Sequence, residues 1–324
     1  FSSLIAPVSQ ARADTQHLNI GMQMGLGYLQ IYVMRAQSLL QKNAAAMGIK
    51  DLDVTYREIG SPVVLNDGIL SGSLDVVVAG VPPAIVFWDK THDTDNPEKI
   101  FAALGSQPIY LVSNDPNVKT IGDFTAQQRI AVPAIKVSTQ SIILGIAAKK
   151  MFGADGAKRF DTMQVAMSHP DAMTALLAGS SIAGDFSSFP FQNVELENPH
   201  IHRVMDSYKV LGGPASIFCV WTTKKYYDEN PKVAQVLWKS LQEATDFIKR
   251  HPSEAIAMYN SIDHSKLPVS SMMDLMKDPE VRFTLAPDAF MQYATYMHES
   301  GLITHMPSSW KDMVLPIAWG LPGS

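Results

Sequence analysis

The chain has 324 residues, of which 46% are hydrophobic, so it is long enough to bury one large core or two modest ones. Its formal net charge is −5 and no basic run occurs, which argues against a nucleic-acid-binding protein. A single cysteine, Cys219, excludes a disulfide within the chain. Because its neighbours are apolar, we interpret it as a small buried side chain.

Residues 1–17 are expected to be either the remnant of a secretory signal peptide or a disordered tail. Ala11-Arg12-Ala13 is a small-x-small pattern before the polar Asp14, as found at signal-peptide cleavage sites. No run of 18 or more apolar residues occurs, so we expect no membrane insertion. These features favour a protein that is secreted to the periplasm.

From residue 18 onward, strand-like and helix-like segments alternate. An apolar run at 75–80 without alternation is typical of a strand that is covered on both faces. The order of elements requires parallel strands with right-handed crossovers. The predicted elements are a strand at 18–22, a helix at 28–47, a strand at 52–56, a helix at 64–70 and a strand at 75–80.

The same unit then repeats, which predicts a second lobe of similar build. Linkers at about 105–115 and 205–215 are expected to be extended crossings between lobe 1 (18–108 and 212–324) and lobe 2 (109–211). C-terminal helices are expected to wrap around lobe 1. The predicted elements are strands at 129–133, 162–166, 182–186 and 216–221, and helices at 138–151, 170–177, 231–248, 253–259, 269–276 and 287–300.

The segment from Leu70 to Pro83, LSGSLDVVVAGVPP, resembles the L-x-G-x-x-D-hydrophobic-G signature of the nitrate, sulfonate, taurine and thiamine-pyrimidine binding family. Residues 120–124 and 221–231 are similar to that family in order and spacing. The resemblance covers about 18–260 and implies an α/β protein with the type II periplasmic-binding fold, in which two lobes joined by two crossings enclose a ligand cleft. It further implies a soluble substrate-binding component of an ABC importer that works with a membrane permease and catalyses no reaction.

Ligands of open parallel sheets bind beyond the carboxyl ends of the strands, where loops enter helix N-termini. This rule selects loops of both predicted lobes, and the resemblance adds the crossings. The candidate ligand-binding residues are Met24, Gly25, Tyr28, Val81, Pro82, Gln107, Lys136, Ser138, Thr139, Gln140, His169, Asp185, Ser187, Phe189 and Gly213.

In the first lobe, Gly25 either lets the backbone approach a ligand or forms an ordinary tight turn. Tyr28 could stack on a ligand or donate a hydrogen bond to it, while Pro82 and its neighbours are expected to form an apolar wall. In the second lobe, residues 136–141 are the best candidate for anion capture. They combine hydroxyls, an amide, free N–H groups and the cation of Lys136, although Ser138 or Thr139 could also be the helix N-cap.

Two further loops follow strands of the second lobe. Ser168 is expected to cap the next helix, while His169 is either a ligand contact or a solvated or capping histidine. A carboxylate at Asp185 would favour an amine, a hydroxyl or a protonated ring nitrogen, unless it pairs with Lys136 or His169. Phe189 and the aromatics beside it could line a pocket for an apolar or ring-bearing ligand.

The nine histidines show no spaced metal motif, and no phosphate-binding loop or nucleophile elbow occurs. We therefore expect no cofactor, no metal and no catalysis. The predicted function is a monomeric importer component that captures a small organic anion, of the sulfonate or carboxylate type, by hinge closure. The alternatives are a thiamine-pyrimidine-precursor binding or biosynthetic protein of the same fold, or a ligand-sensing domain.

Overall fold

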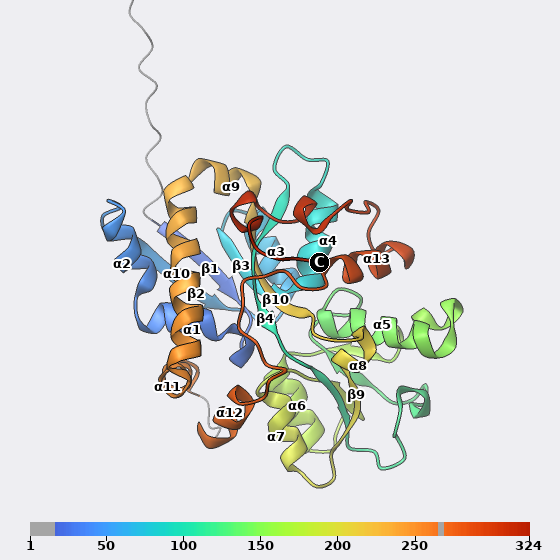
Figure 1. Cartoon of the computed structure of the whole chain (residues 1–324). Coiled ribbons are helices and arrows are strands. Elements are labelled where there is room, and N and C mark those ends of the chain that lie inside the picture. The colour runs from blue at the N-terminus through green and yellow to red at the C-terminus, as the bar shows by residue number, and fades with distance from the viewer. Residues whose placement is uncertain (1–16, 265–268) are drawn as a thin grey trace, which may run out of the picture.

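The computed structural model describes residues 17–264 and 269–324, so the expected signal remnant lies almost wholly outside the described residues. Two separate five-stranded sheets with flanking helices form two α/β lobes (Figure 1). We call the unit around the sheet of β1–β4 and β10 the first lobe, and the unit around β5–β9 the second lobe. The predicted fold class is confirmed, whereas the exact residues at which one lobe passes into the other stay a prediction.

The first-lobe sheet has the strand order β2-β1-β3-β10-β4. β1 pairs in parallel with β2 and β3, while β10 runs antiparallel between β3 and β4. The chain thus returns from the second lobe to complete this sheet. Its strands are β1 (His17–Met22), β2 (Asp53–Glu58), β3 (Val76–Gly80), β4 (Glu98–Ser106) and β10 (Ser216–Thr223).

The second-lobe sheet repeats this topology as β7-β6-β8-β5-β9, again with four strands in one direction and one reversed strand, here β5. The duplicated strand-loop-helix unit that the sequence predicts is therefore present. These strands are β5 (Tyr110–Ser113), β6 (Ile130–Val132), β7 (Gln164–Ala166), β8 (Gly184–Phe186) and β9 (His202–Asp206).

Two expectations about helices in the first half of the chain are wrong. The single helix expected at 28–47 is broken at Ser38, whose φ of 51° is left-handed and cannot continue a right-handed helix. The loop expected at residues 80–83 is already the first turn of a helix, where proline is tolerated because the first N–H groups have no partner inside the helix. The helices are α1 (Leu29–Ala36), α2 (Leu39–Ala46), α3 (Pro62–Leu70) and α4 (Val81–Thr91), with a 3-10 turn η1 (Leu26–Tyr28) before α1.

The first crossing is short, and the return crossing is not extended throughout. β4 ends at Ser106 and β5 begins at Tyr110, so only three residues separate these strands of the two different sheets. The return crossing contains the helix α8. Asp206 caps α8 by accepting a hydrogen bond from the N–H of Tyr208 at 2.9 Å. The second-lobe helices are α5 (Thr139–Phe152), α6 (His169–Leu177), α7 (Phe191–Glu197) and α8 (Ser207–Leu211), with 3-10 turns η2 (Ile121–Asp123) and η3 (Ala154–Lys158).

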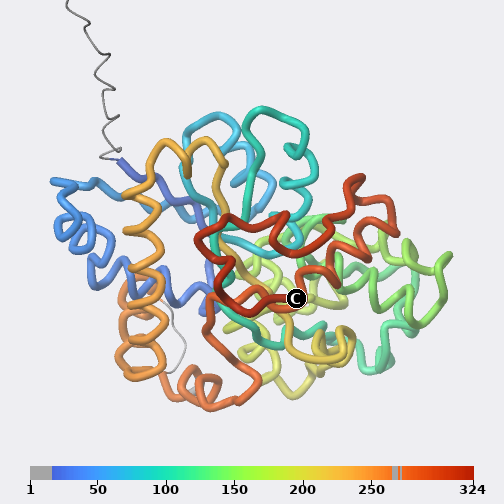
Figure 2. Tube along the Cα trace, turned by 45° about the horizontal axis from the view of Figure 1, so that its top comes forward, coloured from blue at the N-terminus to red at the C-terminus, as the bar shows by residue number. Residues whose placement is uncertain are grey.

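The C-terminal third covers the first lobe and also reaches the second. α10 packs its apolar face on α1 and α2, whereas α13 packs against α4 of the first lobe and α5 of the second (Figure 2). The expectation that these helices wrap around the first lobe alone is therefore incomplete. The elements are α9 (Lys224–Glu229), α10 (Pro231–Arg250), α11 (Pro252–Asp263), α12 (Val269–Met276) and α13 (Phe290–Glu299), followed by the 3-10 turns η4 (Trp310–Asp312) and η5 (Pro316–Ala318).

Candidate ligand-binding site

Loops at the carboxyl ends of parallel strands meet where the two lobes face each other. A Cβ atom placed on Gly80, at the end of β3, would lie 2.2 Å from the hydroxyl oxygen of Thr139 in the other lobe. A Cβ atom on Gly25 would lie 2.9 Å from the carbonyl oxygen of Phe189, also across the lobes. The two lobes are thus in direct contact, and Gly25 serves a close approach between protein segments in this structure.

The first-lobe side of this contact is held by a hydrogen-bonded glutamine that no sequence pattern indicated. Gln23 donates from Nε2 to the carbonyl of Gly60 at 2.8 Å and accepts from the hydroxyl of Tyr28 at 3.1 Å. The Tyr28 ring packs on Phe218 with centroids 4.5 Å apart. Tyr28 therefore has protein partners for both its ring and its hydroxyl. Met24, beside Gln23, is half-buried.

The residues expected to form an apolar wall lie at the start of α4. Val81 and Pro82 are buried in its first turn. Gln107 lies buried in the crossing between β4 and β5, and its Nε2 has no hydrogen-bond partner among the described residues. Buried polar groups are nearly always hydrogen-bonded, so this unpaired amide is an exception. It is a free donor at the junction of the lobes.

In the second lobe, the N-terminus of α5 carries the most distinctive polar group. Ser138 is the N-cap, and its Oγ accepts a hydrogen bond from the N–H of Ser141 at 3.3 Å. Thr139 follows in the first helical turn with 2% of its surface exposed, and its hydroxyl has no partner among the residues described. Ser138 therefore stabilises the helix end, while the Thr139 hydroxyl faces the opposite lobe at Gly80.

Lys136 lies apart from this contact. Its Nζ is 3.2 Å from a carboxylate oxygen of Asp161, and both side chains line a cavity of about 230 Å³ that Tyr296 and Leu302 of the C-terminal segment close. Lys136 therefore pairs with Asp161 and not with Asp185, which was one of the alternatives for that carboxylate. Of the residues expected to capture an anion, Thr139 at the N-terminus of α5 lies between the lobes, whereas the ammonium group of Lys136 does not.

His169 is the first residue of α6 and is buried. Its Nε2 lies 3.3 Å from Nε2 of Gln140, and its ring stacks on Phe191 with centroids 5.8 Å apart at 17°. Burial lowers the pKa of His169 to about 4, so the ring is neutral at pH 7. Ser168 caps α6 by accepting from the N–H of Asp171 at 3.4 Å, as the spacing predicts. The structure thus joins Gln140 and His169, two candidate residues from different loops.

Asp185 has a different neighbour from those expected. Its carboxyl group interacts with the carboxyl of Glu195 on α7 and with the hydroxyl of Ser187, and all three residues are buried. Burial raises the pKa of Asp185, and burial together with the Asp185 charge raises the pKa of Glu195. A close pair of buried carboxyls holds at least one proton at neutral pH. Of the alternatives for Asp185, neither the pairing with Lys136 nor that with His169 is formed among the described residues.

Gly213 lies beyond α8 in the return crossing and is half-buried. Its N–H donates to the carbonyl of Tyr208 at 2.9 Å, and a Cβ atom placed there would meet no atom within 4 Å. This glycine follows Gly212, the C-cap of α8, and its surroundings are open. Among the described residues, no backbone hydrogen bond joins it to the interlobe loops.

Comparison with known proteins identifies the fold. No protein-family model and no curated protein sequence matches the chain. Among solved structures, the periplasmic aliphatic sulphonate binding protein SsuA from Escherichia coli is 16% identical with a TM-score of 0.67, over 93% of this chain and 92% of that chain. The alkanesulfonate-binding protein SsuA from Xanthomonas axonopodis pv. citri, solved with bound MOPS, is 17% identical with a TM-score of 0.68, over 94% and 98%.

A third similar structure is the ligand-binding component of an ABC-type import system from Staphylococcus aureus, solved with bound zinc, which is 14% identical with a TM-score of 0.71, over 94% and 98%. The similarity spans both lobes and all the crossings between them. The chain therefore has the fold of periplasmic binding proteins, and its predicted resemblance to sulfonate-binding proteins is confirmed at the level of fold. Within the described ranges, no helix combines the length and the apolar character that a bilayer crossing needs.

Proposed function

We propose that the chain is the substrate-binding component of an ABC importer and that it captures a small organic anion of the sulfonate or carboxylate class. The observation on which this proposal mainly rests is the Thr139 hydroxyl. It is buried in the first turn of α5, lacks a protein partner in the described structure, and faces Gly80 of the other lobe. Two similar structures described as sulphonate-binding proteins support the same ligand class.

Helix termini supply the recognition chemistry. α5 begins at the contact between Thr139 and Gly80, and α6 begins where the Ser168 side chain lies against Gly60 of the first lobe. The first N–H groups of a helix have no partner within it, and the positive end of the helix dipole favours negative charge. The amide of Gln107 adds a donor in the crossing. An anion between the lobes would therefore meet donors from several elements.

The proposed mechanism is hinge closure without catalysis. Ligand stabilises the closed arrangement because only there can both lobes contact it. A membrane permease would recognise the closed, ligand-bound form and take up the ligand from the periplasm. We propose that the carrier acts as a monomer.

A thiamine-pyrimidine precursor is the second candidate ligand. The neutral His169 ring is stacked on Phe191, and a Cβ atom on Gly25 would lie 3.8 Å from the Phe191 ring. This places aromatic faces beside the interlobe contact, and such faces suit a flat ring.

Calorimetry with ethanesulfonate, taurine, benzoate, nitrate and a hydroxymethylpyrimidine tests the proposal. We expect one organic anion to bind, and Thr139→Val to weaken it by about 1 kcal/mol, or roughly five-fold, because one hydrogen bond is lost at constant shape. The matched control is Thr174→Val at an exposed position of α6. Binding of the pyrimidine alone would select the second candidate, while equal affinities for wild type and Thr139→Val would refute the assigned site.

A further inference from the structure

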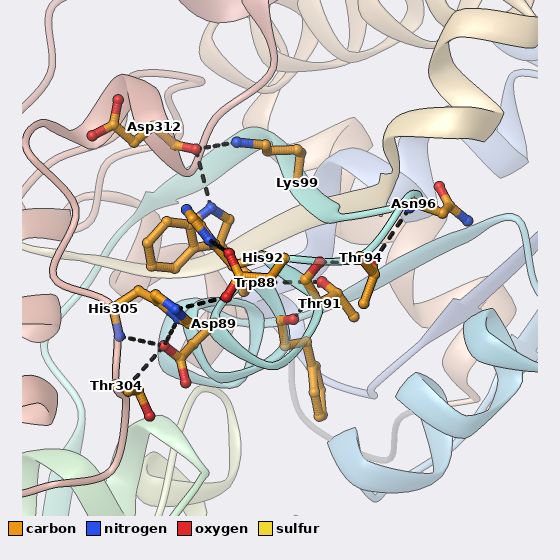
Figure 3. A network of polar contacts seen from close by, with 12 residues as sticks. Trp88, Asp89, Thr91, His92, Thr94, Asn96, Lys99, Thr304, His305 and Asp312 are labelled. Carbon is orange, nitrogen blue, oxygen red and sulfur yellow. Dashed lines mark hydrogen bonds and ion pairs between the residues drawn. The ribbon is translucent and has the colours of Figure 1, made fainter.

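Two histidines and two aspartates converge on the first lobe, away from the interlobe contact. Asp89 lies in the last turn of α4, His92 and Asp93 follow directly, and His305 comes from the segment after α13 (Figure 3). Side-chain ligand atoms of His92, Asp93 and His305 all lie within 4.8 Å of one another. The two histidines are far apart in the sequence, so no motif spacing reveals the cluster.

Asp89 sets the orientation of the His305 ring. Its Oδ1 lies 3.0 Å from Nδ1 of His305 and also accepts from the backbone N–H groups of Thr304 at 2.9 Å and His305 at 2.7 Å. A carboxylate can only accept, so the proton of a neutral His305 ring resides on Nδ1 and the lone pair on Nε2. That Nε2 lies 3.1 Å from a carboxylate oxygen of Asp93. A carboxylate that orients a histidine in this way is the usual outer-shell partner of a metal ligand.

His92 completes the convergence. Its Nδ1 lies 2.8 Å from the other carboxylate oxygen of Asp93, and its ring stacks on His305 with centroids 4.5 Å apart at 15°. The edge contact with Trp88 at 5.1 Å positions the same ring. Without a metal ion, a protonated His305 held between the carboxylates of Asp89 and Asp93 would explain the positions of these two aspartates. It would not account for a second imidazole stacked on that cation with its own nitrogen directed at the same carboxylate.

We propose that His92, Asp93 and His305 bind a divalent transition-metal ion of the zinc class, with Asp89 as the outer-shell partner of His305. Imidazole nitrogens and a carboxylate oxygen are ligands that zinc prefers, and a fourth position would be open to water. Ligand atoms around one tetrahedral zinc ion lie about 3.3 Å apart. The cluster reaches this spacing by small side-chain rotations, which the exposure of His92 (40%) and Asp93 (75%) permits. The bound ion ties the C-terminal segment to the end of α4.

Titration of the tag-free full-length chain with zinc sulfate, followed by calorimetry, tests this site. We expect one equivalent to bind and the melting temperature to rise, and Co²⁺ to give the visible absorption of a four-coordinate complex. His92→Gln should weaken binding by at least the roughly 10–100-fold that loss of an outer-shell partner costs, and Asp89→Asn should fall within that range. His200→Gln, at an exposed position of the second lobe, is the matched control and should bind like wild type.

His92→Gln is the deciding variant because its ring is partly exposed, whereas His305→Gln also changes the contacts of the C-terminal segment. Absence of stoichiometric Zn²⁺ and Co²⁺ binding by the wild-type chain would overturn the proposal. So would equal affinities for the wild type and His92→Gln.

Discussion

The close approach of Gly80 to Thr139 makes a specific prediction about lobe closure. Gly80 has φ −68° and ψ 154°, a conformation that alanine adopts readily, so Gly80→Ala leaves the first lobe able to fold. The new Cβ would lie 2.2 Å from the Thr139 hydroxyl oxygen but 3.5 Å from the Thr139 Cβ, which is ordinary contact. Only the hydroxyl must move, or the lobes must part.

Moving the hydroxyl off its rotamer costs about 0.5–1.5 kcal/mol. The ratio of closed to open molecules in Gly80→Ala should therefore fall by roughly two- to twelve-fold, since 1.4 kcal/mol corresponds to a factor of ten. Adding Thr139→Ala removes the clashing oxygen and should restore closure. This reversal would show a coupling between residues of different lobes. Gly80 is also the N-cap of α4, and a double-mutant cycle separates the coupling from the effect of replacing that cap.

Fluorescence energy transfer between labels at Val63→Cys and Thr174→Cys reports the separation of the lobes, because both positions are exposed and lie near the Gly60–Ser168 contact. The native Cys219 is fully buried and burial raises its thiol pKa, so it should not be labelled. Gly320→Ala is the matched control, since a Cβ atom there meets nothing within 4 Å. Unchanged transfer efficiency in Gly80→Ala, or no recovery on adding Thr139→Ala, would refute this reasoning.

Two further predictions concern buried ionisable groups. His169 has a pKa of about 4 in the folded protein and about 6.5 in the unfolded chain, so its full contribution to the free energy of unfolding is present above pH 6.5. That free energy falls by about 3 kcal/mol as the pH drops to 4, which urea denaturation should show. His169→Gln should lessen this loss, whereas the control His200→Gln, at an exposed position, should not. The pKa of Glu195 is raised in the fold, so its contribution is present below its unfolded pKa of about 4.3 and is lost as the pH rises toward the folded value. Glu195→Gln should therefore lessen the loss of stability between pH 5 and 9, and the same dependence as wild type would contradict a buried protonated carboxyl. The exposed Glu197→Gln is its control.

The repeated unit was predictable because its signals are local. The apolar run that forms β3, with glycine at its end, indicates a buried parallel strand. β4 escaped prediction although residues 100–104 are apolar, because its partner β10 comes from a segment more than a hundred residues later. The break at Ser38 escaped because serine carries no strong signal for a left-handed conformation and the apolar spacing continues across it.

The candidate site was predictable by location but not by orientation. Strand ends and helix starts led to Thr139, which faces Gly80 of the other lobe, and to His169, which contacts Gln140 within the second lobe. For Asp185 the uncertainty lay in which face of the strand carries it, since neighbouring side chains alternate between faces. The structure directs Asp185 to α7 and its neighbour Phe186 into the core. Lys136 diverges for a related reason, because its positive φ of 65° turns the chain before α5 begins.

These orientations change the physical basis of the anion recognition that we propose. Lys136 pairs with Asp161, the Asp185–Glu195 pair holds at least one proton, and His169 is neutral, so neither Lys136 nor His169 supplies a positive charge between the lobes. What remains between the lobes is a hydroxyl, an amide and two helix N-termini. Such donors bind an anion through directed hydrogen bonds in a buried setting, where a low dielectric strengthens each one and an unpaired donor is costly. Selection would then depend on the number and direction of ligand oxygens, which separates a sulfonate from a carboxylate even though both carry one negative charge.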